Sequence, residues 1–121
     1  MKAINIKGKH ALFSKQWHPH RIATVDDMQV ILAKIKGEFV WHSHEDEDEL
    51  FQVIKGTLYM QFRDRTEVVK EGEMIVVPKG VEHNPSTKDG EEVHLLLFEK
   101  LNTAHTGDVD HEMTQTEYPW I

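Results

Sequence analysis

The hydrophobic residues of this chain fall into short runs separated by Gly, Pro, Asp and Asn, a pattern typical of β-strands joined by tight turns. Glycines recur at these breaks, and the turns are expected at 36–37, 55–56, 71–72, 79–80 and 89–90. The runs between them predict strands at 21–25, 28–36, 38–44, 49–55, 57–63, 66–70, 73–77, 81–83 and 91–99. A helix is expected only at 11–17.

The alternation of side chains within the strands indicates how they are buried. In 50–55 and 57–63 successive residues separate into two faces, as in a strand with one face towards a core. Segments 74–77 and 95–98, in contrast, are apolar on both faces. Strands buried on both sides belong to a two-sheet sandwich or a closed barrel, so the fold class is predicted to be all-β.

The chain length allows one hydrophobic core and little else. With 121 residues we expect an N-terminal segment at 1–20, a β-barrel at 21–100 and a C-terminal tail at 101–121. The tail is polar but ends in an aromatic cluster, Tyr118 to Ile121. It is expected either to fray or to pack that cluster on the barrel or on a partner subunit.

Charge and composition limit the partners. A net charge of -7 disfavours nucleic acid and anionic membranes, because both are bound through basic patches. The chain has no apolar run long enough to span a membrane, and its first nine residues contain no hydrophobic signal-peptide segment, so a cytoplasmic location is expected. Since there is no cysteine, a metal site would have to use imidazole and carboxylate ligands.

Two histidines at 42 and 44 form the first candidate motif. Side chains two residues apart share one face of a strand, but lie on different faces of a helix. The pair alone is weak evidence, because with nine histidines about one His-x-His is expected by chance. Indeed a second pair occurs at His18 and His20, but it precedes the barrel pattern and contains a proline, so we leave it out of the site.

The surroundings of His42 and His44 carry more weight. Gly37 precedes the pair, Glu49 follows His44 by five residues, and Gly56 follows Glu49 by seven. A second frame, Gly72-x5-Pro78-x-Gly80-x2-His83, comes after it. Glycine, proline, glycine and histidine at those offsets are expected by chance on the order of once in a thousand such sequences.

These two frames, covering 37–56 and 72–87, resemble the motifs of the cupin superfamily, G-x5-H-x-H-x3-4-E-x6-G and G-x5-P-x-G-x2-H-x3-N. The resemblance implies a jelly-roll barrel that holds a metal through His42, His44, Glu49 and His83, and the chain is most similar to the short bacterial cupins. Two departures are that four residues separate Gly37 from His42 and that Thr87 replaces the asparagine.

Three imidazoles and one carboxylate suit one divalent ion: Mn, Fe, Ni, Co or Zn. Four ligands leave two octahedral positions open, as a catalytic site requires. Asp48 competes with Glu49 as the carboxylate, but Glu49 shares the face of Phe51 and Val53, which favours it.

Other residues are assigned by their surroundings. Tyr59, Gln61 and Phe51 are candidates for a ligand pocket around the metal. His94 lies among apolar residues and is expected to be a hydrogen-bonded core histidine. Surface positions are expected for the remaining isolated histidines: His10, His105 and His111.

Three functions remain open. The first is a metal-dependent oxygenase acting on a small organic substrate. The second is a sugar or keto-acid isomerase or epimerase, and the third is a non-catalytic protein that binds a small molecule or a metal. A homodimer is expected, because small cupins pair and an exposed barrel edge needs covering.

Overall fold

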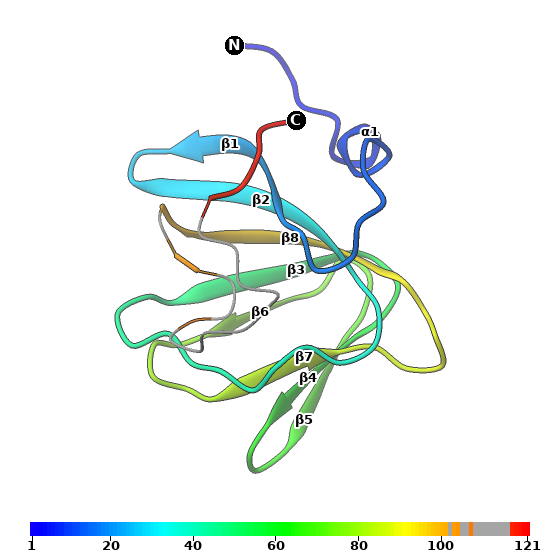
Figure 1. Cartoon of the computed structure of the whole chain (residues 1–121), viewed down its shortest axis with the longest axis vertical. Helices are drawn as coiled ribbons and strands as arrows, with labels where there is room; N and C mark the ends of the chain where they lie inside the picture. The colour runs from blue at the N-terminus through cyan, green and yellow to red at the C-terminus, as the bar shows by residue number, and fades with distance from the viewer. Residues whose placement is uncertain (102, 105–106, 108–116) are drawn as a thin grey trace.

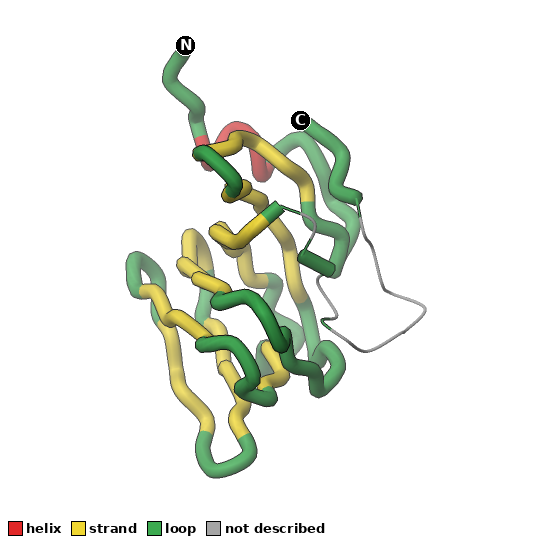
Figure 2. The backbone as a smooth tube through the Cα atoms, turned by 90° about the vertical axis from the view of Figure 1, so that its left-hand side faces the viewer, coloured by secondary structure: helices red, strands yellow, loops and turns green. Residues whose placement is uncertain are grey.

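Two antiparallel β-sheets face each other in the computed structural model, which describes all residues except 102, 105–106 and 108–116 (Figures 1 and 2). The larger sheet has the order β1-β2-β8-β3-β6 and the smaller one the order β5-β4-β7. The elements are α1 (Ile6–His10), β1 (His20–Val25), β2 (Met28–Ile35), β3 (Glu49–Lys55), β4 (Leu58–Phe62), β5 (Thr66–Val69), β6 (Met74–Val77), β7 (His83–Ser86) and β8 (Val93–Lys100). The predicted all-β barrel is confirmed.

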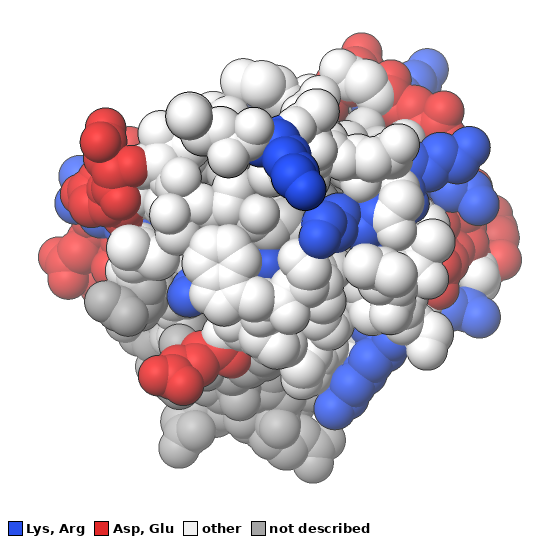
Figure 3. Space-filling view, turned by 90° about the horizontal axis from the view of Figure 1, so that it is seen from above, with Lys and Arg blue, Asp and Glu red and all other residues white. Residues whose placement is uncertain are grey.

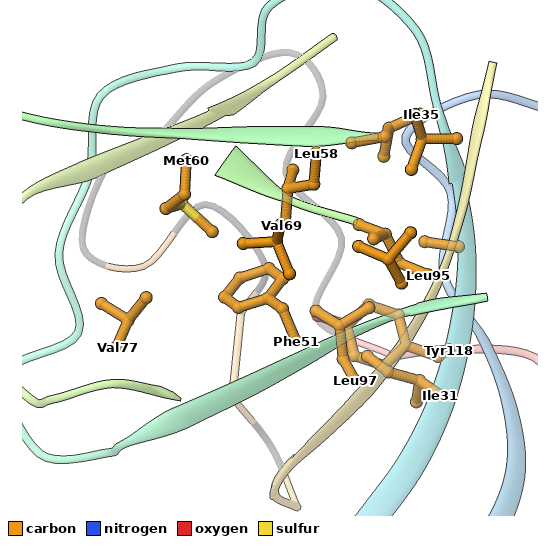
Figure 4. Packing of buried hydrophobic residues seen from close by; sticks show 13 residues of the cluster. Ile31, Ile35, Phe51, Leu58, Met60, Val69, Val77, Leu95, Leu97 and Tyr118 are labelled. Carbon is orange, nitrogen blue, oxygen red and sulfur yellow. The ribbon is translucent and has the colours of Figure 1, made fainter. Parts of the chain in front are cut away.

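The hydrophobic core lies between the two sheets, and the period-two pattern of the strands builds it (Figure 4). On β3, Phe51 and Val53 point inwards and are buried, whereas their neighbours are half-buried. Leu58 and Met60 do the same from β4 on the opposite sheet. Full burial of one such side chain contributes about 1.5–3 kcal/mol, so this layer holds the sheets together.

The helix predicted at 11–17 is wrong. The helix of the structure precedes it, at Ile6–His10, where the Asn5 side chain caps its first turn by accepting a hydrogen bond from the Gly8 N–H at 2.7 Å. The segment after it is hydrogen-bonded to β2 instead: the Trp17 N–H donates to the Lys34 carbonyl at 2.9 Å. Trp17 also has a φ of 57°, which an α-helix cannot contain.

The strand predicted at 38–44 is present only as an irregular edge. It pairs with β7 at two isolated bridges, Glu38 with Ser86 and His42 with His83. One more residue lies between the bridges on the 38–44 side than on β7, which makes a bulge. Pro85 lies opposite this bulge and has no N–H to donate, so a regular ladder cannot form.

The sequence predicts that strand β6 is buried on both faces, but in the structure only one of its faces is buried. Val77 is buried, but Met74 and Val76 are 57% and 47% exposed. They lie on the side of the larger sheet that faces away from the core. Packing in the barrel's own core therefore does not account for their apolar character.

The last residues of the chain lie against β1. The Arg21 N–H donates to the Pro119 carbonyl at 2.8 Å, and the Ile121 N–H donates to the Arg21 carbonyl at 3.1 Å. Tyr118 is buried, and its hydroxyl donates to the Thr103 carbonyl at 2.9 Å. Within the described residues, no helix has the length and apolar character needed to cross a membrane.

Candidate metal centre

Four side chains from three separate segments meet at one end of the barrel. His42 and His44 come from the irregular edge, Glu49 is the first residue of β3, and His83 is the first residue of β7. Their ligand atoms all lie within 4.8 Å of one another, and each side chain is at most 4% exposed. The structure thus brings together all four residues that the sequence predicts as ligands.

Backbone hydrogen bonds place the ligands. The His42 N–H donates to the His83 carbonyl at 3.1 Å, and the His83 N–H donates back to His42 at 2.9 Å. This directly opposed pair sets the two imidazole centroids 4.3 Å apart. The Gly80 N–H donates to the His44 carbonyl at 2.7 Å, so the turn of the second motif is attached to the first motif.

Hydrogen bonds from Nδ1 to backbone carbonyls orient two of the imidazole rings. His42 Nδ1 lies 2.8 Å from the Val40 carbonyl, and His83 Nδ1 lies 2.9 Å from the Val81 carbonyl. A carbonyl only accepts, so each Nδ1 carries a proton, and in a neutral ring of this kind Nε2 is the nitrogen with the free lone pair. Both Nε2 atoms are buried and have no hydrogen-bond partner among the described residues. Buried acceptors arranged in this way suit a metal ion.

The charge states of His42 and Glu49 also suit the binding of a cation. Burial, followed by the neighbouring His83, lowers the pKa of His42 to about 4, so its imidazole is neutral near pH 7. Burial alone would raise the pKa of Glu49, but His44 and His83 hold it well below its usual range. Glu49 Oε1 lies 3.4 Å from His44 Nε2 and 3.6 Å from His83 Nε2. Neutral imidazoles with one carboxylate are a donor set for a divalent transition metal.

The neighbouring carboxylate, Asp48, points elsewhere. It is exposed, and its Oδ1 accepts a hydrogen bond from the Lys79 N–H at 2.9 Å. This bond ties the acidic loop to the Pro78-x-Gly80 turn. Asp48 therefore has a structural contact outside the cluster, whereas Glu49 lies inside it.

A small apolar cavity of about 30 Å³ adjoins the cluster. His42 and Glu49 are its polar wall residues. The apolar walls include Trp17, Ala33, Phe39, Phe51, Pro85 and Leu97. A larger open groove of about 890 Å³ runs between β5 and β6, but none of the four clustered residues lines it.

Of the three residues expected in a ligand pocket, Phe51 lines this cavity and the other two do not. On β4 it is Leu58 and Met60 that point inwards, so Tyr59 and Gln61 face away from the core. Gln61 accepts a hydrogen bond from Asn84 at 3.2 Å, and Lys88 Nζ lies 4.3 Å from the centroid of the Tyr59 ring.

Sequence reasoning missed a second buried acid, Glu99. It is 0% exposed, on the inward face of β8 two residues after Leu97. Burial and then the charge of Glu49 raise its pKa well above the usual value. The alternation Val93, Leu95, Leu97, Glu99 is the signal that could have revealed its inward direction.

The other histidines are not part of the cluster. His94 is largely buried and pairs with Glu92 Oε1 at 2.9 Å. The surface position predicted for His10 is wrong: it is 1% exposed, stacks on His94 and lies 3.1 Å from the Leu95 carbonyl. His18 and His20 are not among the four clustered residues: His20 stacks on Phe13, and His18 lies against His20. His105 and His111 lie outside the described residues.

Comparisons with known proteins identify the family and the fold. Residues 28–99 match the family model described as "Cupin domain". The crystal structure of a cupin-2 domain containing protein from Shewanella frigidimarina NCIMB 400 superimposes with a TM-score of 0.78. It is 46% identical, over 81% of this chain and 94% of that one.

Among curated proteins, YdbB of Bacillus subtilis (strain 168) is 43% identical over 82 residues, which are 67% of this chain and 66% of YdbB. Acireductone dioxygenase 2 of Arabidopsis thaliana is 35% identical over 94 residues. These cover 70% of this chain but only 48% of the plant protein, so this chain matches about half of that relative's length. By its family match and its strand arrangement, this chain belongs to the cupin family.

Proposed function

We propose that this protein is a metal-dependent oxygenase that acts on a small organic molecule. His42, His44, Glu49 and His83 would hold one divalent ion. The carrying observation is the buried cluster itself, in which all four ligand atoms lie within 4.8 Å of one another. A redox-active ion bound there would supply Lewis acidity and electron transfer to dioxygen.

The protein's own residues have distinct parts in this proposal. The Val40 and Val81 carbonyls keep Nε2 of His42 and His83 directed into the site. Glu49 supplies the one negative charge of the ligand set. Phe39 and Phe51 line the apolar side of the site and would exclude water from the reacting groups.

Two observations favour oxygenation over the sugar or keto-acid isomerase. Among the residues that the structure describes, no lysine or arginine lines the cavity beside the cluster, so these residues offer no cradle for a phosphate or for a polar sugar. The similarity to a protein named acireductone dioxygenase extends over 70% of this chain. This similarity also supports an oxygenase, although the two proteins are only 35% identical over the matched residues.

The test is metal analysis followed by oxygen consumption. The chain is purified without added metal, its metal content is measured, and oxygen uptake is followed with flavonols, diketones, catechols and acireductone. The expected result is about one Mn, Fe, Co or Ni per chain and uptake with at least one substrate. Zinc without any oxygen uptake would overturn the oxygenase and leave a non-catalytic binding protein.

A matched pair of histidine variants keeps this experiment specific. His83→Gln removes a proposed ligand, and His18→Gln makes the same change outside the cluster. We expect metal content and oxygen uptake to fall together in His83→Gln and to stay at the wild-type level in His18→Gln. Equal losses in both variants would contradict the assignment.

A further inference from the structure

A second buried acid lies beside the metal cluster. Of the acidic residues that the structure describes, only Glu49 and Glu99 are buried, at 2% and 0% exposed. The other described acids lie wholly or partly at the surface, where Figure 3 shows several of them. Burying a carboxyl group is costly unless it is paired or hydrogen-bonded, so the position of Glu99 requires a partner.

The strand register places Glu99 beside Glu49. β8 lies between β2 and β3 in the larger sheet, and Leu50 of β3 is opposite Phe98 of β8. One step further along this ladder, Glu49 comes opposite Glu99. Opposite residues of neighbouring antiparallel strands point to the same face, with Cβ atoms about 4.5–5.5 Å apart. Both side chains point inwards and are buried, so their carboxyl groups are within reach of each other.

The neighbour of Glu99 on its other side has different partners. Gln29 of β2 lies opposite Glu99 and is fully buried as well. Its Oε1 accepts a hydrogen bond from Arg21 Nε at 2.9 Å, and its Nε2 donates to the Lys100 carbonyl at 3.4 Å. Among the described residues, no group donates a hydrogen bond to either carboxyl oxygen of Glu99. This leaves Glu49 as the partner of Glu99.

A hydrogen bond between the two carboxyl groups needs a proton on one of them, because an ionised carboxylate only accepts. Burial, the charge of Glu49 and a hydrogen bond with its carboxylate raise the pKa of Glu99 well above its usual range. Burial would also raise the pKa of Glu49, but His44 and His83 hold it low. Glu99 is therefore the donor and Glu49 the acceptor. Glu49 Oε1 faces the Nε2 atoms of the two histidines, which leaves Oε2 to accept from Glu99.

We propose that Glu99 is a positioning residue for the metal ligand Glu49, and that it holds the second oxygen of this carboxylate by a hydrogen bond. The inference rests on the metal centre proposed above. A carboxylate held in this way would bind the ion through one oxygen. The two open octahedral positions then stay available for substrate and dioxygen, whereas a Glu49 bound through both oxygens would occupy one of them.

The test is the affinity of the purified full chain for Zn²⁺ and Mn²⁺, measured by competition with a chelator. Glu99→Met keeps the length of the side chain but removes the donor, and it should weaken binding about 10–100-fold. Glu99→Gln keeps a donor in its amide NH₂ group, so its affinity should stay close to that of wild type. If Glu99 were instead a further ligand, both variants would lose affinity, so the pair separates a donor from a ligand.

Gln29→Met is the matched control, because it makes the same kind of change at the buried residue opposite Glu99 on β2. We expect it to lower the free energy of unfolding and to leave the metal affinity at the wild-type value. If Glu99→Met fails to fold, as judged by circular dichroism, Glu99→Asp takes its place. That change withdraws the acid by one methylene, so the affinity should again fall while Glu99→Gln stays close to wild type.

Three results would overturn the proposal: wild-type affinity in the variant that removes or withdraws the donor, a loss in Glu99→Gln as large as in that variant, or an equal loss in Gln29→Met. A wild-type chain that binds neither ion would overturn the metal centre and this inference with it. Because the measurement is affinity and not oxygen uptake, the positioning role of Glu99 can fail while the oxygenase holds, and the reverse.

Discussion

Replacing Glu49 by Gln should lower the stability of the metal-free protein and also weaken metal binding. The Glu49 carboxylate is 2% exposed and lies 3.4 Å from His44 Nε2 and 3.6 Å from His83 Nε2. These histidines lower the pKa of Glu49 although burial alone would raise it, so the ionised carboxylate stabilises the folded state at neutral pH. Metal-free Glu49→Gln is therefore expected to melt below the wild-type temperature.

The affinity for the metal should also be lower in the Glu49→Gln variant. A ligand at 1,000 times its Kd stabilises the folded state by about 4.1 kcal/mol. If the loss of the anionic ligand weakens binding about 100-fold, about 2.7 kcal/mol of this stabilisation disappears. For a chain of this length, 1 kcal/mol corresponds to about 3–5 °C in Tm. The metal-induced rise in Tm should thus shrink by about 10 °C, which differential scanning fluorimetry with added Zn²⁺ or Mn²⁺ can measure.

Asp48→Asn is the control, because it makes the same chemical change on the adjacent exposed residue. Asp48 accepts a hydrogen bond from the Lys79 N–H, so its replacement should cost a little stability without changing the metal-induced rise. A wild-type metal response in Glu49→Gln, or an equal reduction in both variants, would refute the assignment of Glu49 as the ligand.

Three further predictions test the packing of the fold. Burial lowers the pKa of His10 below its usual 6.5, so the unfolded state takes up a proton first as the pH falls. Urea stability should then drop below about pH 6.5, by up to about 1.4 kcal/mol per pH unit, and His10→Gln should flatten that slope. Phe51→Ala should lower the free energy of unfolding by about 3–5 kcal/mol, whereas the exposed Met74→Ala should change it by less than about 0.5 kcal/mol. Tyr118→Phe removes the hydroxyl that donates to Thr103 and should cost about 0.5–1.5 kcal/mol in the same urea titration.

Local periodicity predicted most of the barrel, because strand alternation and turn glycines are short-range signals. The four clustered residues were predicted from the two motifs and their resemblance to those of cupins. Periodicity did not predict the bulge opposite Pro85, which depends on a strand more than 40 positions away in the chain. The inward direction of Leu58 and Met60 was visible in the pattern, but Tyr59 and Gln61 were still assigned to the pocket for their polar groups. Glu99 was missed for the converse reason, since an acid is not expected on an inward face.

The four clustered residues come from both sheets and from the edge beside them. Glu49 belongs to the larger sheet and His83 to the smaller one, while His42 and His44 lie on the irregular edge beside β7. An ion held by all four would connect these segments. Amide exchange of the reciprocal His42 and His83 N–H groups should therefore slow when Zn²⁺ is added. The control is the β4–β5 hairpin, which contributes no ligand and should respond only through global stability. Unchanged exchange at His42 and His83 in the presence of bound Zn²⁺ would place the ion elsewhere.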